Sequence, residues 1–471
     1  MPEVETIPEL VEGSAVLARA PEPDAAQWVA ADLAHVVHPQ HYRGETQAPR
    51  IWVGGRGAYL RDEQGRDYLD GLSGMWNSYL GQGRTELIEA AARQATELSF
   101  ATGYAGSLLP VTVRLAQELA QIAYPGIDSF YFTSGGSEAT DTSIRTARYY
   151  WRALGRPEKQ VIISRELSYH GSGIGSASAT GVAEFSAGFG GRLPGYRLIG
   201  SPYPYRYEST AGVPDGIAAA NLLEQAILAE GPDRVAAFIA EPVQGGGGGV
   251  LVPQPEYFAR VREICDAYQV LFISDEVITG FGRTGRWFAL EHWGVVPDIV
   301  QFAKGITSGY FPFGGVGFSQ PIRQVLDDAT SGDRWWHGYT NSGHPIGAAV
   351  ALAPLDVIRS EGLVERAALL GDRLLAGLRA ELDDHPHVGD IRGLGLLAAV
   401  EPVADRATKR PFAEADQVST RIREVLYRDG LVTRVLDNAI CLAPPLIVTE
   451  AELDRIVTTV ATAVREVTHH N

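Results

Sequence analysis

The stretch Val270-Leu-Phe-Ile-Ser-Asp-Glu-Val277 is an apolar run that ends in two carboxylates. A second run of this kind, Asp298-Ile-Val-Gln-Phe-Ala-Lys304, ends in a lysine. Runs that are apolar throughout indicate strands buried on both faces, as in a parallel sheet. We therefore predict two parallel strands whose charged residues lie at the carboxyl ends, which is where sites in such sheets form.

Similar runs alternate with helical patterns between about Gly81 and Gln320. Val161-Ile-Ile and Val235-Ala-Ala-Phe-Ile-Ala are strand-like, whereas Glu256–Tyr268 has one apolar helical face. This alternation predicts an α/β fold with a large, mostly parallel sheet that helices cover on both faces.

The C-terminal part has a different pattern, with long helices rich in Ala, Leu and Arg after about Gly347. The glycine-containing run from Val388 to Val400 is typical of a single strand, so we predict a second, smaller α+β domain. The segment before about Asp24 has no clear period and is predicted to be a mobile or loosely docked arm, and short strands are expected from about Arg50. The predicted division is residues 1–80 for the arm and part of the small domain, 81–345 for the large domain and 346–471 for the small one.

Composition excludes several classes of protein. The chain has 471 residues, of which 45% are hydrophobic, and its net charge of −17 disfavours nucleic-acid and anionic membrane partners. Cys265 and Cys441 are the only cysteines, too few for a disulfide framework or a cysteine metal site. We find no secretory signal pattern and no run of the ~18 apolar residues that a membrane helix needs, so we predict a cytoplasmic protein.

Asp275 and Glu276 end the first apolar run. Burial of an unpaired carboxylate is costly, so each is expected to have a partner, and an ion pair to a core arginine is one alternative. Adjacent strand residues point to opposite faces, so the two carboxylates should not converge on a metal ion or act as a glycosidase pair. We predict no metal site.

Lysine occurs only at Lys159, Lys304 and Lys409. Lys159 lies in a Pro-Glu-Lys segment that is typical of a solvated loop, and Lys409 lies in a polar segment. Lys304 follows a buried strand, where desolvation favours a neutral amine and a role as a Schiff-base nucleophile. A lysine that only reaches toward solvent is the alternative.

Two other stretches contain residues of chemical interest. Phe130-Tyr-Phe-Thr-Ser-Gly-Gly-Ser137 joins an aromatic strand to a helix, and Gly135, Gly136 and Ser137 are candidates for holding a phosphate at the helix N-terminus. A simple tight turn is the alternative. Tyr169, in Ser168-Tyr-His-Gly171, could stack on a flat heterocycle or be an ordinary packed side chain.

A phosphate site, a buried carboxylate, a lysine and a stacking ring together match what pyridoxal phosphate requires. The sequence resembles the class III pyridoxal-phosphate aminotransferases of fold type I, and in particular their ω-amino acid or amine:pyruvate branch. The resemblance runs from about Gly44 to the end. It is most specific in three stretches: Ser274-Asp-Glu-Val-Ile-Thr-Gly-Phe-Gly-Arg-Thr-Gly285, Ala303-Lys-Gly-Ile-Thr-Ser-Gly-Tyr310 and His337-Gly-Tyr-Thr-Asn-Ser-Gly-His-Pro345.

The resemblance implies roles for individual residues. Lys304 would hold the cofactor covalently and then act as a base, and Asp275 would face the pyridine nitrogen. Thr340 of a second subunit would complete the phosphate site, which implies a homodimer or a tetramer built from dimers. The cofactor ring would lie between Tyr169 and Val277, and its phosphate would bind Gly135, Gly136 and Ser137. Glu241 would lie in a second layer behind these contacts. The substrate pocket would be lined by Trp76, Tyr104 (from the partner), Tyr169, Gly246 and Arg434.

The chain departs from the family pattern in two places. The phosphate turn reads Ser134-Gly-Gly-Ser137 where the family usually has Asn-Ser-Gly-Ser, so backbone groups would replace one hydroxyl contact. The run Gly245–Gly249 is also one residue longer than usual. No Gly-Lys-Ser/Thr follows it, so it is not a Walker loop.

Three classes of function are consistent with these residues. The first is an aminotransferase that moves an amino group from a primary amine or ω-amino acid to a 2-keto acid such as pyruvate. The second is an aminomutase or decarboxylase on the same fold, and the third is a non-catalytic module that binds the cofactor. Lys304 and Asp275 argue against the third. Arg434 favours the first, because a guanidinium can bind the keto-acid carboxylate, although a surface or interface arginine is the alternative.

Overall fold

A computed structural model of the protein describes residues 24–40, 49–104, 106–208, 212–436 and 439–469. The chain divides into two units, of which the first comprises the residues up to Gly54 and Arg61–Asp67. In this unit helix α1 (Ala25–His35) begins with a capping box, in which Gln27 N–H donates to Asp24 Oδ1 at 2.8 Å. The arm predicted before Asp24 lies outside the described residues.

The second unit comprises Gly55–Leu60 and Tyr68–Asn471. The short strands expected after Arg50 are present as β1 (Trp52–Arg56), β2 (Tyr59–Asp62) and β3 (Asp67–Asp70). Strand β3 pairs in parallel with β13 (Leu431–Val432), so the start of this unit is joined to its C-terminal part.

The predicted large sheet is confirmed. Within the described residues it has seven strands in the order β4-β10-β9-β8-β7-β5-β6. Only β10 is antiparallel to its neighbours, β4 and β9, and the other pairs are parallel. The strands are β4 (Ile127–Thr133), β5 (Val161–Arg165), β6 (Tyr196–Ile199), β7 (Val235–Ala240), β8 (Leu271–Asp275), β9 (Ile299–Phe302) and β10 (Gly314–Ser319).

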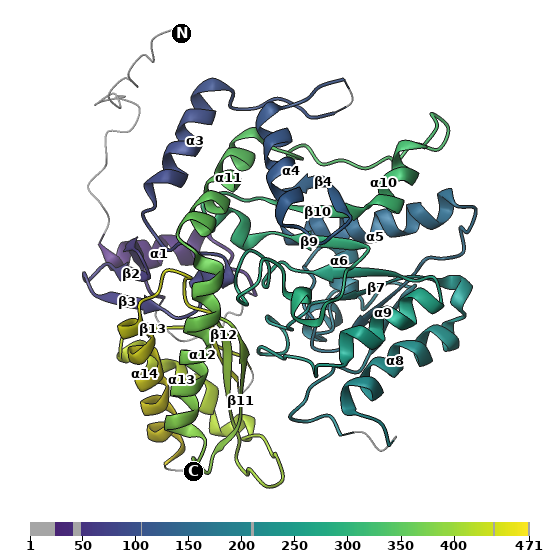
Figure 1. The fold of residues 1–471 in the computed structure, drawn as a ribbon. Helices are drawn as coiled ribbons and strands as arrows, with labels where there is room; N and C mark the ends of the chain where they lie inside the picture. The colour runs from purple at the N-terminus through teal and green to yellow at the C-terminus, as the bar shows by residue number, and fades with distance from the viewer. Residues whose placement is uncertain (1–23, 41–48, 105, 209–211, 437–438, 470–471) are drawn as a thin grey trace. The chain divides into compact units, whose positions relative to one another are not determined.

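Both faces of this sheet are buried, as its apolar strands predict. Along β7, Ala237 and Ile239 belong to the cluster formed with helix α5 (Gly136–Ala153). The alternate residue Phe238 belongs to the cluster that contains α8 (Asp215–Glu230) and α9 (Tyr257–Ala267), which lie beside the sheet in Figure 1. Because successive strand residues point to opposite faces, helices on both sides hold the strand ends in place.

A second sheet has the order β11-β12-β15-β14, and β11 (Val388–Leu394) and β12 (Leu397–Pro402) pair antiparallel. The prediction of a single strand over Val388–Val400 was therefore wrong. The chain reverses at Gly395, whose φ of +56° is in the left-handed region, and a Cβ there would lie 2.4 Å from the backbone of Thr284. The strands β14 (Arg434–Leu436) and β15 (Ala439–Leu442) complete this sheet.

Helices α12 (Leu363–Leu382) and α13 (Val418–Arg428) pack beside the second sheet, and α14 (Glu450–Thr468) packs on both of these helices (Figure 1). The three-part division at residues 80 and 345 stays a prediction. In the described part of the chain, no helix is both long and apolar enough to span a membrane. The other α-helices are α2 (Ser73–Trp76), α3 (Thr85–Glu97), α4 (Pro110–Ile122), α6 (Ile174–Ala179), α7 (Glu184–Ala187), α10 (Gln320–Asp327) and α11 (Pro345–Ser360).

Candidate active site

The carboxyl ends of the parallel strands bring the predicted residues to one edge of the large sheet. Asp275 is the last residue of β8, and Lys304 follows β9 after one alanine. Glu241 follows β7, and Tyr169 lies in the loop after β5. Since β7, β8 and β9 are adjacent and parallel, their terminal side chains are neighbours.

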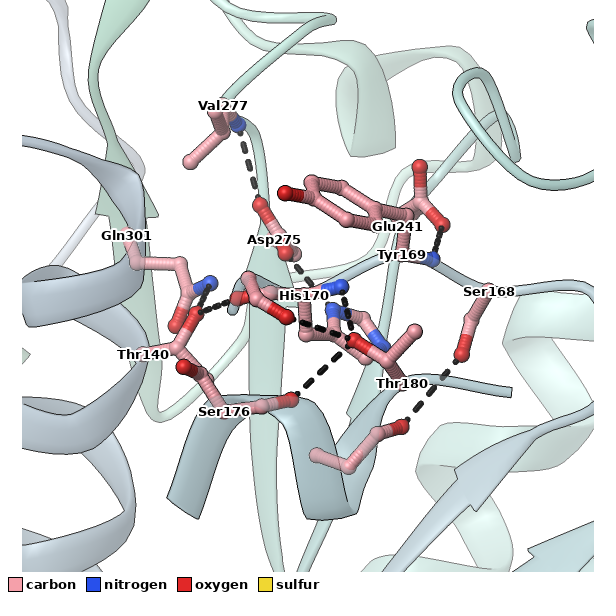
Figure 2. A network of polar contacts seen from close by, with 12 residues as sticks. Thr140, Ser168, Tyr169, His170, Ser176, Thr180, Glu241, Asp275, Val277 and Gln301 are labelled. Atoms are coloured by element: carbon pink, nitrogen blue, oxygen red, sulfur yellow. Dashed lines mark hydrogen bonds and ion pairs between the residues drawn. The ribbon is translucent and has the colours of Figure 1, made fainter. Parts of the chain in front are cut away.

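Asp275 is paired with a histidine, not with an arginine. Its Oδ2 atom lies 2.6 Å from His170 Nδ1, a distance at which the ring N–H donates to the carboxylate, and Oδ1 accepts from Val277 N–H at 3.1 Å (Figure 2). The side chains of His170 and Asp275 are 0% and 3% exposed. The backbone of His170 is fixed in turn, because its N–H donates to Thr180 Oγ1 at 3.0 Å and its carbonyl accepts from Thr140 Oγ1 at 2.7 Å.

His170 is the residue that the sequence reasoning missed. It follows Tyr169 directly in the stretch already singled out, so a signal was available. The sequence did not show that the loop turns the histidine ring toward Asp275 across the edge of the sheet.

Glu241 bridges two loops. Its Oε1 atom accepts from Tyr169 N–H at 2.9 Å, and Oε2 accepts from Gly245 N–H at 3.1 Å. Burial raises the pKa of this carboxyl group, and the nearby His170 acts in the opposite direction. Glu241 thus holds the loop of Tyr169 against the start of the glycine run, whose Gly246 would place a Cβ 3.7 Å from the Cβ of Tyr169.

Lys304 has an unusual backbone and an unpaired amine. Its φ is +46°, and in the described part of the chain its Nζ atom makes no hydrogen bond or ion pair. Burial lowers the pKa of Lys304 to about 8, while the negative charges of Asp275 and Glu241 act to raise it. The amine is therefore poised to exchange a proton near neutral pH.

The predicted phosphate turn lies at the start of α5, a helix of 18 residues. Gly135 is its N-cap, and no side chain caps the N–H groups of the first turn. A Cβ on Gly135 would meet nothing within 4 Å, whereas one on Gly136 would lie 3.2 Å from Val277 Cγ1. Ser137 Oγ accepts from Ser172 N–H at 3.1 Å, which ties the turn to the loop that contains Tyr169.

The two candidate ring contacts come from different loops. Tyr169 packs edge-on against Phe185, with the ring centroids 5.0 Å apart, and its hydroxyl lies 3.1 Å from Ser172 Oγ. Val277, held by Asp275, lies against Gly136. Both side chains lie beside Asp275 (Figure 2).

Trp76 and Arg434 lie beside Lys304. The Lys304 Nζ atom is 5.7 Å from the centroid of the Trp76 ring, and the Arg434 guanidinium carbon is 5.8 Å from it. Among the described residues the Arg434 side chain makes no hydrogen bond or ion pair. Its guanidinium covers the indole without being anchored by a carboxylate.

Tyr104 and Thr340 lie together at the surface. Both side chains are exposed, and Tyr104 Oη donates to the carbonyl of Tyr339, next to Thr340, at 3.4 Å. Tyr339 Oη in turn lies 3.5 Å from the carbonyl of Glu138 in the first turn of α5. The contribution of Tyr104 and Thr340 to a partner's site stays a prediction.

One expectation about charged residues was wrong, and one alternative considered for Glu276 is not observed. Lys159 is fully buried, not solvated, because its Nζ donates to the Pro232 carbonyl at 2.8 Å and lies 4.7 Å from the centroid of the Trp151 ring. Glu276 has no arginine partner among the described residues. It accepts from the hydroxyls of Tyr124 and Thr279 and from the backbone N–H groups of Ala289 and Leu290.

Comparison with known proteins identifies the family of this chain. The profile of the family described as aminotransferase class-III matches residues 41–464. A putrescine–pyruvate aminotransferase from Pseudomonas aeruginosa is 39% identical over 436 residues, which cover 92% of this chain and 94% of the relative.

Two solved structures agree with this match. An (S)-enantioselective omega-transaminase from Thermomicrobium roseum is 42% identical, with a TM-score of 0.90 over 95% of this chain and all of that one. The omega-transaminase of Pseudomonas jessenii in complex with PMP is 38% identical, with a TM-score of 0.90 over 94% of this chain and 98% of that one. The resemblance seen in the sequence is thereby confirmed, and this chain belongs to the class III aminotransferase family.

Proposed function

We propose that this aminotransferase moves an amino group from a primary amine or ω-amino acid to a 2-keto acid such as pyruvate, using pyridoxal phosphate in a ping-pong reaction. The observation that carries the proposal is the unpaired Lys304 amine beside the His170–Asp275 pair at one edge of the sheet. The family is pyridoxal-phosphate dependent, and one solved relative was crystallised with PMP.

The residues fit this cofactor. The uncapped start of α5 suits a phosphate, since N–H groups and the positive end of the helix dipole both favour an anion. The buried Asp275 carboxylate suits a cationic ring nitrogen. Lys304 is the only one of the three lysines at this edge, and its amine is the group that could bond the aldehyde of the cofactor.

When bound, pyridoxal phosphate supplies an aldehyde for the amine and a ring that accepts carbanion electrons. Gly135, Gly136 and Ser137 would hold its phosphate, and Tyr169 and Val277 would flank its ring. Asp275, kept in place by His170, would stabilise positive charge on the ring nitrogen. Lys304, once released by the substrate amine, would carry the proton from the substrate carbon.

We propose that the substrate is recognised by the residues that lie beside Lys304, namely Trp76 and Arg434. Trp76 would form an apolar wall, and Arg434 would bind the carboxylate of the keto acid. Because the Arg434 side chain has no ion-pair partner within the described residues, it can move off the indole when an uncharged amine binds. Tyr104 and Thr340 from a second copy of the chain would close the site, so we propose that the homodimer is the active form.

The test is a spectroscopic screen of the purified holoenzyme with donors and acceptors added separately. A primary amine alone should remove the visible cofactor band, and pyruvate should then restore it with formation of alanine. Loss of the band accompanied by carbon dioxide would support a decarboxylase instead. A band that responds to no amine would contradict the proposed activity.

A further inference from the structure

The turn that carries Trp76 has a strained backbone. Its φ values are +52° at Ser73, +65° at Gly74 and +58° at Trp76. A left-handed conformation is uncommon for a non-glycine residue and a genuine outlier for one as bulky as tryptophan. Such strain persists only where the surroundings fix it, and it is concentrated at functional sites.

Asp70 fixes the backbone of this turn. Its Oδ1 atom accepts from Leu72 N–H at 3.0 Å, and Oδ2 accepts from Gly74 N–H at 2.7 Å. Asp70 is itself 3% exposed, so water does not compete for these bonds. Both oxygens of the carboxylate are committed to the turn.

Arg283 fixes the same turn through a side chain. The guanidinium Nη2 donates to Ser73 Oγ at 3.1 Å, and Ser73 Oγ donates to the Ala443 carbonyl at 2.7 Å. Arg283 is fully buried, and its Nη1 donates to the Pro444 carbonyl at 2.5 Å. Burial of a charged group costs desolvation and seldom adds stability over an apolar side chain, so the buried Asp70 and Arg283 are better explained by the geometry that their hydrogen bonds impose.

Arg283 also supports the backbone beside Lys304. Its guanidinium carbon lies 4.3 Å from the centroid of the Tyr79 ring. That ring packs so closely on Gly305 that a Cβ there would lie 2.3 Å from it. One buried cation thus contacts both the turn that carries Trp76 and the ring that packs against the residue after Lys304.

We propose that Asp70 and Arg283 are positioning residues for substrate selection. By holding the Leu72–Trp76 turn, they keep the Trp76 indole beside Lys304 and Arg434, and so set the size of the amine substituent that the site admits. The inference rests on the proposed function, and it assigns a role to the Gly-Phe-Gly-Arg283 stretch that the proposed reaction leaves unused.

The test uses two variants that loosen the turn without deleting the buried arginine. Ser73→Ala removes the oxygen that Arg283 reaches, and Asp70→Asn leaves one backbone N–H facing an amide NH₂. The matched controls are Thr449→Ala, a helix cap on α14, and Asp298→Asn, which accepts from a backbone N–H and an arginine at the start of β9.

The primary measurement is kcat/KM of the holoenzyme for primary amines of increasing bulk, with pyruvate fixed. Poor placement of an apolar wall changes discrimination by about tenfold per methylene-sized difference, so we expect the bulky-to-small ratio to rise about five- to tenfold in both variants. The controls should keep the parent ratio. Equal slowing for every amine would overturn the inference and indicate a structural role only.

Two further measurements separate the possible failures. Hydrogen–deuterium exchange over residues 71–78 of the full chain should accelerate in Ser73→Ala and Asp70→Asn, and unchanged exchange would also overturn the inference. In a Trp76→Ala background, Ser73→Ala should cause no additional change in the ratio, because its effect passes through the indole. If the parent transaminates no amine, the proposed function fails, and the exchange measurement alone decides whether Asp70 and Arg283 hold the turn.

Discussion

The free-base fraction of Lys304 offers a quantitative test of the site. Burial lowers the pKa of this amine from 10.5 to about 8. At pH 8, about half of the Lys304 amine is then neutral, against about 0.3% for an ordinary lysine, a roughly 150-fold difference in reactive species. Lys304 should therefore react with aldehydes at a pH where an ordinary lysine hardly reacts.

The assay is reductive labelling of the cofactor-free protein with a small aromatic aldehyde from pH 6 to 11. Mass spectrometry then reports labelling at each of the three lysines. Lys159 is an internal control, because burial also lowers its pKa to about 8 but its amine lies under Trp151 with no exposure. We expect a midpoint near pH 8 for Lys304 and little labelling of Lys159 at any pH.

Charge variants give the sign of the electrostatic contribution. Asp275 raises the pKa of Lys304 and Arg434 lowers it. Asp275→Asn should therefore move the labelling midpoint to lower pH, and Arg434→Ala should move it to higher pH. A parent midpoint near 10.5, with no response to either variant, would refute the account of Lys304 as a desolvated amine.

Other substitutions test the remaining roles. Lys304→Ala should abolish turnover without a loss of melting temperature, and a rate near the parent's would show that another group moves the proton. Asp275→Asn should lower the rate of proton abstraction by about 10²–10³, since a unit charge at short range contributes about 3–4 kcal/mol; unchanged abstraction kinetics would reduce Asp275 to a structural partner of His170. Arg434→Ala should weaken the pyruvate half-reaction by about 2–5 kcal/mol while simple amines react nearly as before. Stopped-flow measurement of each half-reaction checks this, and equal losses in both would indicate a structural arginine.

The sheet and the strand-end residues were predictable because one physical pattern determines both. A strand buried on two faces is apolar along its whole length, so the first charged residue marks the point where it leaves the core. Asp275 and Lys304 are marked in this way, and the structure places them on the neighbouring strand ends of β8 and β9.

The polar partners of these residues were less predictable. The sequence showed that Asp275 and Glu276 need compensation but not which groups provide it, because the partners come from loops far away along the chain. His170 reaches Asp275 from 105 residues earlier, and Tyr124 reaches Glu276 from 152 residues earlier. The β11–β12 hairpin was missed for a similar reason, since the contact that requires Gly395 is with the backbone of Thr284.

Lys159 and Lys304 show why a shifted pKa alone does not identify a site. Burial lowers the pKa to about 8 in both residues. The Lys159 amine is satisfied by the Pro232 carbonyl and covered by an indole, just before β5 begins and thus at the opposite edge from the candidate site. Lys304 has the same acidity but no hydrogen bond within the described residues, and it follows the carboxyl end of β9 beside Asp275. Desolvation makes an amine reactive, but only an unpaired amine facing other functional groups can use that reactivity on a substrate.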